Sequence, residues 1–220
     1  MTPNELTHLV RTRHTCKAFD PTRQIPPGQV AALLDVLQHA PSSVNSQPWH
    51  FIVAASASGK TRLTQGFPGV YAYNAPKVLN ASHTVVLCRR TDMDDAHFAR
   101  VLDQEDADGR FSSGQAKEAA RKSRAMYLDM HHNLWQDTGA WMDKQVYIAL
   151  GMLVESAALL GIDTCTMEGF DQPALDQALG LPEQGLTAVV LVALGYRSAD
   201  DFNAALPKSR LEPAQLFTHL

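Results

Sequence analysis

Two clusters of basic residues, one near each end of the chain, have the types and spacing that can bind an anion. Arg11, Arg13 and Lys17 lie around a threonine near the N-terminus, and Lys208 and Arg210 flank a serine near the C-terminus. Guanidinium and ammonium groups supply the charge that a phosphate dianion needs, and hydroxyl groups complete its shell. Composition alone favours a solvated basic surface instead, because charged side chains are usually exposed.

A second segment with possible phosphate chemistry is Ser58-Gly59-Lys60-Thr61, which has half of a P-loop pattern. The pattern also requires a glycine five positions before Gly59, where the chain has Ala54. Gly-Lys-Thr is common at helix starts, so a plain helix start is the interpretation that we favour. No GxGxxG motif is present, and a Rossmann dinucleotide site is therefore not expected.

The histidines and cysteines form no metal or nucleophile motif. His131 and His132 are adjacent, and neighbouring residues on a helix point about 100° apart, so both cannot face one ion. No HExxH, GxSxG or CxxC motif occurs. Cys16, Cys88 and Cys165 lie far apart, which argues against a disulfide framework and favours a reducing compartment. Cys16 stands beside a lysine that could lower its pKa, but a small buried side chain is the favoured interpretation.

The composition is that of a globular protein without a general affinity for nucleic acids or anionic membranes. Of the 220 residues, 45% are hydrophobic and 19% are charged, which is enough for one compact domain with a sizeable core. The formal net charge of -4 lacks the basic surplus that such partners require. Residues 92–108 contain seven acids and one base, which predicts a solvated helix face. Neither a signal segment nor a membrane helix is predicted, so we expect a cytoplasmic location.

The pattern of apolar residues predicts long helices and a few strands. A capping box of Thr2 and Glu5 begins a helix that should end near residue 12, and a second helix is expected over 30–37. Residues 94–160 are predicted to be almost entirely helical, with breaks near 108–109 and 137–139 and a buried central helix at the end. Strands are predicted at 49–54, 84–88 and 187–194. Helices massed together without regular βαβ alternation favour an α+β fold.

The last segment, residues 198–220, should be an extended arm. It has two prolines and little periodicity, yet it carries large apolar residues: Phe202, Leu206, Leu211, Leu216 and Phe217. Apolar groups spread along irregular chain must be buried somewhere, so we expect this arm to pack on its own core or on a partner subunit.

Several ordered segments together resemble one known family. Residues 13–19 (RHTCKAF) and 40–49 (APSSVNSQPW) resemble the flavin-site segments of the nitroreductase family. Further similar segments lie at 101–111, 144–147, 168–171 and 201–211, so the resemblance extends over essentially the whole chain. It implies a single α+β domain over residues 1–220, with a central, mostly antiparallel sheet flanked by helices. It also implies an intertwined homodimer, in which the arm at about 198–220 packs on the partner subunit.

The resemblance further implies that FMN binds at the dimer interface and that NADH or NADPH reduces it. Contacts with the FMN phosphate are implied for Arg13, Lys208 and Arg210, and contacts along the ribityl chain and ring edge for His14, Thr15 and Lys17. Contacts with the ring and neighbouring atoms are implied for Asn74, Lys77 and Gln145, and a passage beside N5 for Met167, Glu168 and Gly169. The loop residues Pro41, Ser42, Ser43 and Asn45 would come from the other subunit.

The implied activity is a ping-pong, two-electron reduction of nitroaromatics and quinones in a pocket near Val44, Tyr73 and Tyr127. No side chain needs to act as a catalyst, because a flavin carries the redox chemistry. Trp49 and Trp141 are expected in the core and not against the cofactor. The alternative is a flavin-free interaction protein, or a P-loop-like nucleotide binder, on the same scaffold.

Overall fold

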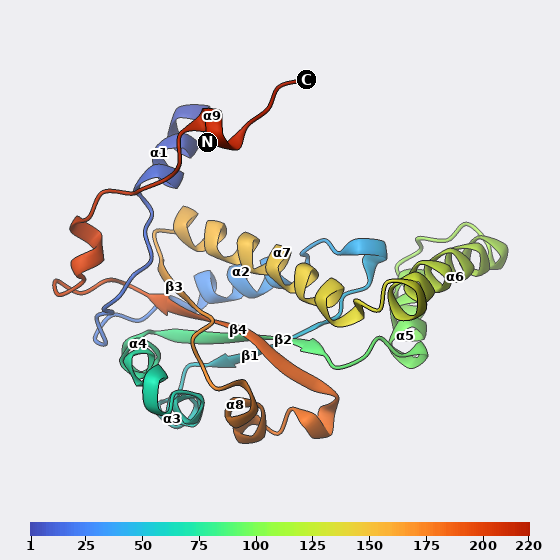
Figure 1. Cartoon of the computed structure of the whole chain (residues 1–220), viewed down its shortest axis with the longest axis horizontal. Helices are drawn as coiled ribbons and strands as arrows, with labels where there is room; N and C mark the ends of the chain where they lie inside the picture. The colour runs from blue at the N-terminus through green and yellow to red at the C-terminus, as the bar shows by residue number, and fades with distance from the viewer.

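The computed structural model describes residues 1–220 and centres on a four-stranded antiparallel sheet (Figure 1). The strands are β1 (Trp49–Ala54), β2 (His83–Arg90), β3 (Asp163–Met167) and β4 (Leu186–Gly195). Their order across the sheet is β1-β2-β4-β3, and every neighbouring pair is antiparallel. The two inner strands, β2 and β4, are therefore the ones covered on both faces and by neighbours on both sides.

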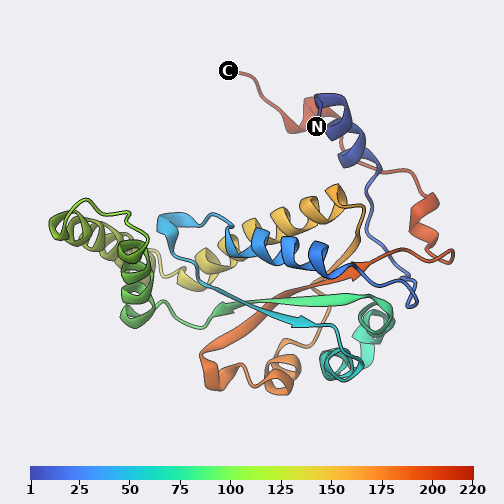
Figure 2. The same ribbon diagram turned by 180° about the vertical axis from the view of Figure 1, so that it is seen from behind.

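Nine α-helices surround or extend from this sheet. They are α1 (Pro3–Thr12), α2 (Pro27–Gln38), α3 (Ala57–Leu63), α4 (Ala75–Asn80), α5 (Asp95–Ala107), α6 (Gly114–Asp129), α7 (Thr138–Leu159), α8 (Gln172–Leu179) and α9 (Pro213–Leu216). Helices α2 and α7 cover one face of the sheet, and α3, α4 and α8 cover the other (Figures 1 and 2). The molecule is thus a three-layer α+β domain, as the sequence predicts.

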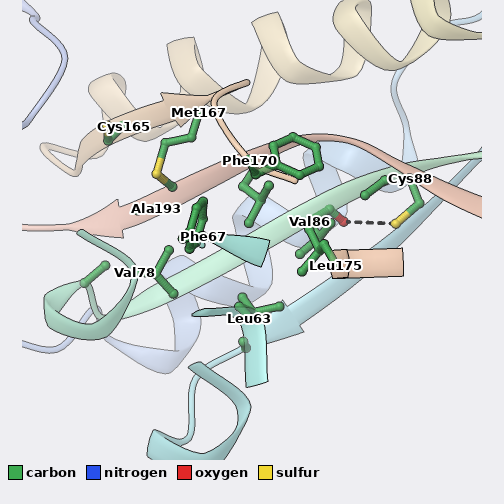
Figure 3. Close-up of a cluster of buried hydrophobic side chains, with 14 of the residues drawn as sticks. Leu63, Phe67, Val78, Val86, Cys88, Cys165, Met167, Phe170, Leu175 and Ala193 are labelled. Atoms are coloured by element: carbon green, nitrogen blue, oxygen red, sulfur yellow. Dashed lines mark hydrogen bonds between the residues drawn. The ribbon is translucent and has the colours of Figure 1, made fainter. Parts of the chain in front are cut away.

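Alternation along the inner strands explains the two cores. In β2, Val86 and Cys88 face one hydrophobic cluster, while Val85 and Leu87 face the other. Successive side chains of a strand point to opposite faces, so one buried strand serves both layers. Figure 3 shows one cluster, in which side chains from three helices meet the sheet: Leu63 of α3, Val78 of α4 and Leu175 of α8 lie near Val86 and Ala193.

The predicted elements are largely confirmed. The capping box is present, with Thr2 Oγ1 accepting from the Glu5 backbone and the Glu5 carboxylate accepting from Thr2 N, and α1 ends at Thr12. The central helix and the central strand are α7 and β4, within a few residues of the predicted bounds. Strand β3 was not predicted as an element, because its five residues DTCTM mix polar and apolar side chains.

Helices α5 and α6 form a hairpin that extends from one end of the sheet (Figures 1 and 2). They have their own small hydrophobic cluster, which includes Phe98, Leu102, Leu128 and Trp141. The prediction that the acidic segment 92–108 is a solvated face is wrong in one respect: the Glu105 side chain is 3% exposed. Its burial requires partners, because an unpaired buried charge is strongly destabilising.

The C-terminal segment leaves the body of the molecule as an extended arm, and α9 ends up beside α1, away from the sheet (Figures 1 and 2). The five large apolar side chains named above, Phe202, Leu206, Leu211, Leu216 and Phe217, are all more than half exposed. These apolar side chains therefore do not pack on the chain's own core. No helix in the structure is long and apolar enough to cross a membrane.

Candidate functional site

The two basic clusters come together, although almost the whole chain separates them. All of their basic residues except Lys17 line one cavity of about 290 Å³ that contains no acidic residue among its lining side chains. Its lining includes Arg13, His14 and Thr15 from the segment after α1, and Lys208 and Arg210 from the arm. Burial lowers the pKa of Lys208, and the charges of Arg13 and Arg210 lower it further. Cations that repel one another around an acid-free cavity form a site suited to an anion.

Asp201 holds the two sides of this cavity together. Its buried carboxylate lies 2.9 Å from Nε2 of His14 and accepts from the backbone N of Lys17 at 3.0 Å. Asn203, two residues later, donates from Nδ2 to the Thr15 carbonyl at 2.7 Å. Burial opposes ionisation of Asp201, but the hydrogen bonds from His14 and the backbone outweigh it and lower its pKa. Asp201 was absent from the residues predicted for the site.

A second group gathers around Lys77, whose side chain is buried between α4 and the end of β3. Its Nζ donates to Oδ1 of Asn74 at 2.6 Å and lies 4.6 Å from the centre of the Tyr73 ring. Asn74 in turn donates from Nδ2 to the Gly169 carbonyl at 2.8 Å. Burial lowers the pKa of Lys77, and the nearby charge of Lys17 lowers it further. The side chain of Lys77 therefore makes its hydrogen bond to a neutral amide, and the structure gives it no carboxylate partner of its own.

Gly169 is required where the chain passes this lysine. A Cβ at this position would lie 2.7 Å from Oη of Tyr73 and 3.2 Å from Nδ2 of Asn74. A side chain here would push aside the exposed hydroxyl end of Tyr73 and shift the Asn74 amide by a few tenths of an ångström. The absence of a side chain keeps the backbone of this segment accessible beside Lys77, which suits a flat ligand.

The residues before Gly169 have different surroundings. Met167 is 3% exposed and its side chain lies in the core cluster of Figure 3, so only its backbone is available to a ligand. The Glu168 carboxylate accepts from the hydroxyl of Tyr147 on α7. Burial, together with this carboxylate, raises the pKa of Tyr147 to about 12. Tyr147 is a further residue that sequence reasoning did not find.

The loop between Pro41 and Pro48, here called the 41–48 loop, forms a separate group on the α7 face of the sheet. Oε1 of Gln145 on α7 accepts from the Ser43 backbone at 2.8 Å, and Ser42 Oγ accepts from Gln47 N at 3.0 Å. Gln145 therefore lies with this loop and not with Asn74 and Lys77, which lie on the other face. In one chain the predicted site residues divide into two groups on opposite sides of the sheet.

Three residues of the 41–48 loop have energetically unfavourable backbone angles. Val44, Asn45 and Gln47 have positive φ angles of 51°, 53° and 44°. For a β-branched residue such as Val44 this is a rare conformation, and such strain costs about 1–3 kcal/mol and persists only where surrounding contacts impose it.

The predicted acceptor residues also divide between the two groups. Val44 and Tyr127 pack against the same small cluster at the base of α6 and α7, whereas Tyr73 is 62% exposed beside Lys77. Tyr127 makes edge contacts with the rings of His131 and Trp141, at centroid distances of 5.1 Å and 6.2 Å. Trp141 itself is 3% exposed, so its expected place in the core is confirmed.

Other motifs weighed from the sequence have structural roles. Lys60, the lysine of the half P-loop, donates to the carbonyls of Leu79 and Ala81 at 2.9 Å and 2.8 Å, and so ties α3 to the end of α4. Ser56 caps α3, which is the helix-start interpretation. Cys16 is fully buried, and burial raises the pKa of its thiol, so a reactive thiolate at this position is excluded. No group of three or more metal-ligating side chains is assembled.

The sequence profile of the Nitroreductase family matches residues 10–196, which include the whole sheet, the 41–48 loop and the Lys77 group, and end before the arm. The chain belongs to the nitroreductase family. It is 46% identical over 207 residues to the oxygen-insensitive NAD(P)H nitroreductase of Salmonella typhimurium, covering 94% of this chain and 95% of that protein. It is 33% identical over 204 residues to the major NAD(P)H-flavin oxidoreductase of Aliivibrio fischeri, covering 92% and 93%.

Solved nitroreductase structures have the same fold. A nitroreductase-like protein from Streptococcus mutans aligns over 100% of both chains with a TM-score of 0.81 at 21% identity. A nitroreductase from Exiguobacterium sibiricum, solved in complex with FMN, covers 100% of this chain and 99% of its own with a TM-score of 0.76 at 19% identity. At these identities the likeness concerns the arrangement of the sheet and helices. The predicted nitroreductase fold is thereby confirmed.

Proposed function

We propose that this nitroreductase-family protein is an FMN-dependent NAD(P)H oxidoreductase that transfers two electrons to nitroaromatics and quinones. The observation that carries the proposal is the pair of cationic groups, the acid-free cavity at Arg13, Lys208 and Arg210 and the buried Lys77 beside Lys17. The names of the relatives point in the same direction, since one is an NAD(P)H nitroreductase and another an NAD(P)H-flavin oxidoreductase. Relatives with these names favour a flavin over an unrelated phosphate ligand.

The residues present fit FMN at both of its ends. A phosphate monoester carries up to two negative charges, which the cations of the cavity can neutralise. At the other end, Gly169 leaves its backbone open beside the ring of Tyr73 and the buried Nζ of Lys77. A buried ammonium whose side-chain hydrogen bond goes to a neutral amide attracts a group that can carry negative charge.

When bound, FMN would supply the acceptance and donation of hydride. Lys17 and Lys77 would be the residues that stabilise negative charge on a reduced flavin, because fixed cations at the place where charge develops lower its energy. Asn74 positions Lys77, and Gly169 positions Asn74 through its carbonyl. Tyr147 holds the Glu168 carboxylate and so orients the backbone that passes the ring. No proton-transferring side chain is assigned.

A homodimer is part of the proposal, because one chain divides the predicted residues between two faces of its sheet. The 41–48 loop and Gln145 of one chain would complete the site that Lys77 and the basic cavity begin in the other. Exposed apolar side chains support this, since α7 exposes Ile148 and Leu159 by 42% and 46%, and the arm exposes Leu211 by 64%. Large exposed apolar patches of this kind mark protein interfaces.

The proposed reaction is a two-step exchange in one pocket. NADH or NADPH binds and leaves first, and a flat, electron-poor acceptor then occupies the same place. A dihydropteridine is a further acceptor of this class. Two-electron transfer bypasses nitro radicals that oxygen would re-oxidise, so the rate should be independent of oxygen.

Steady-state kinetics of the FMN-reconstituted protein test this proposal. With NADH and either nitrobenzene or 1,4-benzoquinone varied together, we expect parallel double-reciprocal lines and equal rates of acceptor loss in air and under nitrogen. Intersecting lines would exclude the two-step exchange. Oxygen-dependent cycling of the nitro compound would exclude two-electron transfer, and absence of turnover with every acceptor would overturn the assignment as a whole.

A further inference from the structure

The acidic segment that the sequence describes as a solvated face contains one carboxylate that serves a different purpose. Glu105 on α5 is almost fully buried, and both of its oxygens have partners. Arg124 on α6 binds it in a two-pronged contact, Nη1 to Oε2 at 2.5 Å and Nη2 to Oε1 at 2.8 Å. Arg110 adds a longer ion pair at 3.6 Å. A buried ion pair of this geometry holds its members in one arrangement.

The remaining bond of Glu105 goes to the 41–48 loop. Nδ2 of Asn45 donates to Oε1 of Glu105 at 2.7 Å, across 60 residues of sequence. Burial raises the pKa of Glu105, but the hydrogen bonds from Arg124 and Asn45 outweigh that effect and lower it. The carboxylate is therefore ionised at neutral pH and accepts from both donors at once. A neutral amide in its place would keep one acceptor oxygen, and its NH2 group would face Nη1 of Arg124, so the two-pronged contact that orients the group toward Asn45 would be lost.

This contact determines which way the Asn45 side chain faces. Oδ1 of Asn45 accepts from Nε2 of Gln47 at 3.2 Å, while its Nδ2 donates to Glu105. Both the oxygen and the nitrogen of the Asn45 amide thus have a hydrogen-bond partner, and one N–H of its NH2 group has none. Asn45 and Gln47 are also two of the three loop residues with positive φ angles, so the amide that Glu105 orients links two strained positions of the loop.

A second tie runs from the same helix to the same loop. Nε2 of His97 on α5 lies 2.7 Å from the carbonyl oxygen of Ser46. Gln145 fixes Ser43 from α7, and its own Nε2 is held by the Trp141 carbonyl at 2.8 Å. The 41–48 loop is therefore held by α7 through Gln145 and by the α5–α6 hairpin through His97 and the buried carboxylate of Glu105.

We propose that Glu105 is a positioning residue: through Asn45 it holds the 41–48 loop in the strained conformation in which it meets the cofactor of the other subunit. The identity of that ligand rests on the proposed function. The hairpin of α5 and α6 then acts as a support for the loop, with Arg124 completing the support. Loss of the carboxylate releases Asn45 and lets the loop relax toward unstrained backbone angles.

Two readouts on the full-length protein test this inference, one of which needs no cofactor. The first is hydrogen exchange of the 41–48 loop, measured by mass spectrometry, and the second is FMN affinity, measured by flavin fluorescence. In Glu105→Gln we expect exchange of the loop amides and the dissociation constant of FMN each to rise about 10-fold or more. Glu118→Gln is the matched control, because it makes the same change in a surface ion pair on α6 and should alter neither.

A reciprocal variant separates positioning from general loss of structure. Asn45→Asp combined with Glu105→Gln reverses donor and acceptor and keeps an acid beside Arg124, so loop protection should return to within about threefold of wild type. Unchanged loop exchange in a folded Glu105→Gln protein would overturn the inference, as would equal losses in the reciprocal and single variants. If wild-type protein bound no FMN, the proposed function would fail, while the exchange data would still decide the role of Glu105.

Discussion

The substitution Arg210→Ala tests the phosphate end of the site most cleanly. Arg210 lies on the exposed arm, where its side chain hydrogen-bonds only the neighbouring Ser209 carbonyl at 2.6 Å. Its charge contributes to the lowered pKa of Lys208, so removing it relieves repulsion within the cavity. The FMN-free variant should therefore be no less stable than wild type. Only the affinity for a phosphorylated ligand should suffer.

The expected loss of affinity follows from the chemistry of the contact. A charge-assisted hydrogen bond contributes about 1.5–3 kcal/mol, which corresponds to about 10- to 100-fold in the dissociation constant. Because Arg210 is exposed, solvent and salt screen it, and the loss should lie near the lower end of that range.

Flavin fluorescence titration of the apoprotein with FMN and with riboflavin measures this loss. Riboflavin lacks the phosphate, so its affinity should be the same for wild type and Arg210→Ala, whereas FMN affinity should differ. Lys122→Ala provides a control, since it removes one positive charge from an exposed position on α6, outside the cavity. An equal loss for FMN and riboflavin, or no loss for FMN, would refute the role given to Arg210.

Three further predictions concern the remaining contacts of the site. Lys77→Met should leave FMN bound but slow its reduction by NADH by about 10-fold or more in stopped-flow measurements, because the cation near the ring is lost; an unchanged rate would contradict this role. Gly169→Ala should lower FMN affinity, because its methyl group covers the backbone beside Lys77, while stability in urea unfolding should fall by at most about 1 kcal/mol, because the exposed Tyr73 side chain can move aside; a wild-type FMN affinity would contradict this role. In the folded protein the pKa of Asp201 lies below its ordinary value of 3.8. The ionised carboxylate therefore stabilises the fold above pH 3.8, and this contribution is lost as the pH falls through the lower folded-state pKa. Asp201→Asn weakens the contact with His14, so the free energy of unfolding, measured in urea, should fall less steeply at acid pH than in wild type. The same fall in both proteins would contradict the assignment.

Much of the fold follows from local sequence signals. The capping box at Thr2 and Glu5, the apolar run of β4 and the long apolar helix α7 are local patterns, and each became the element that it predicts. Strand β3 lacks such a signal. It exists because β4 offers it a partner, with Thr164 opposite Leu194 and Met167 opposite Leu191. Pairing of this kind depends on the assembled sheet and cannot be inferred from five residues alone.

The roles of the site residues stay predictions, but the structure shows how those residues are grouped. Arg13 and Lys208 were assigned to one phosphate because the family resemblance linked them; in the structure they line one cavity, and Asp201 joins the two ends of the chain beside it. Gln145 was grouped with Lys77, yet it lies with the 41–48 loop on the other face. Sequence spacing carries no information about which face of a sheet two distant residues share.

The residues that sequence reasoning missed are those that act through others. Tyr147, Asp201 and Glu105 each orient another residue's backbone or side chain. All three lie in segments that resemble the family, but their residue types alone assign them no role. Glu105 in particular looks like one acid among seven. Only the packing of α5 against α6 brings Arg124 to it and separates it from the solvated carboxylates of the same helix. Such residues become visible when burial and hydrogen bonds are known.

The most direct test of the account is anaerobic spectroscopy of the FMN-reconstituted protein. We predict that one equivalent of NADH or NADPH per bound flavin bleaches the visible flavin absorption in the absence of any acceptor, and that nitrobenzene or 1,4-benzoquinone then restores it. A protein that cannot be reconstituted with FMN, or whose bound flavin keeps its colour with both nicotinamide cofactors, would contradict the assignment as a flavin-dependent oxidoreductase.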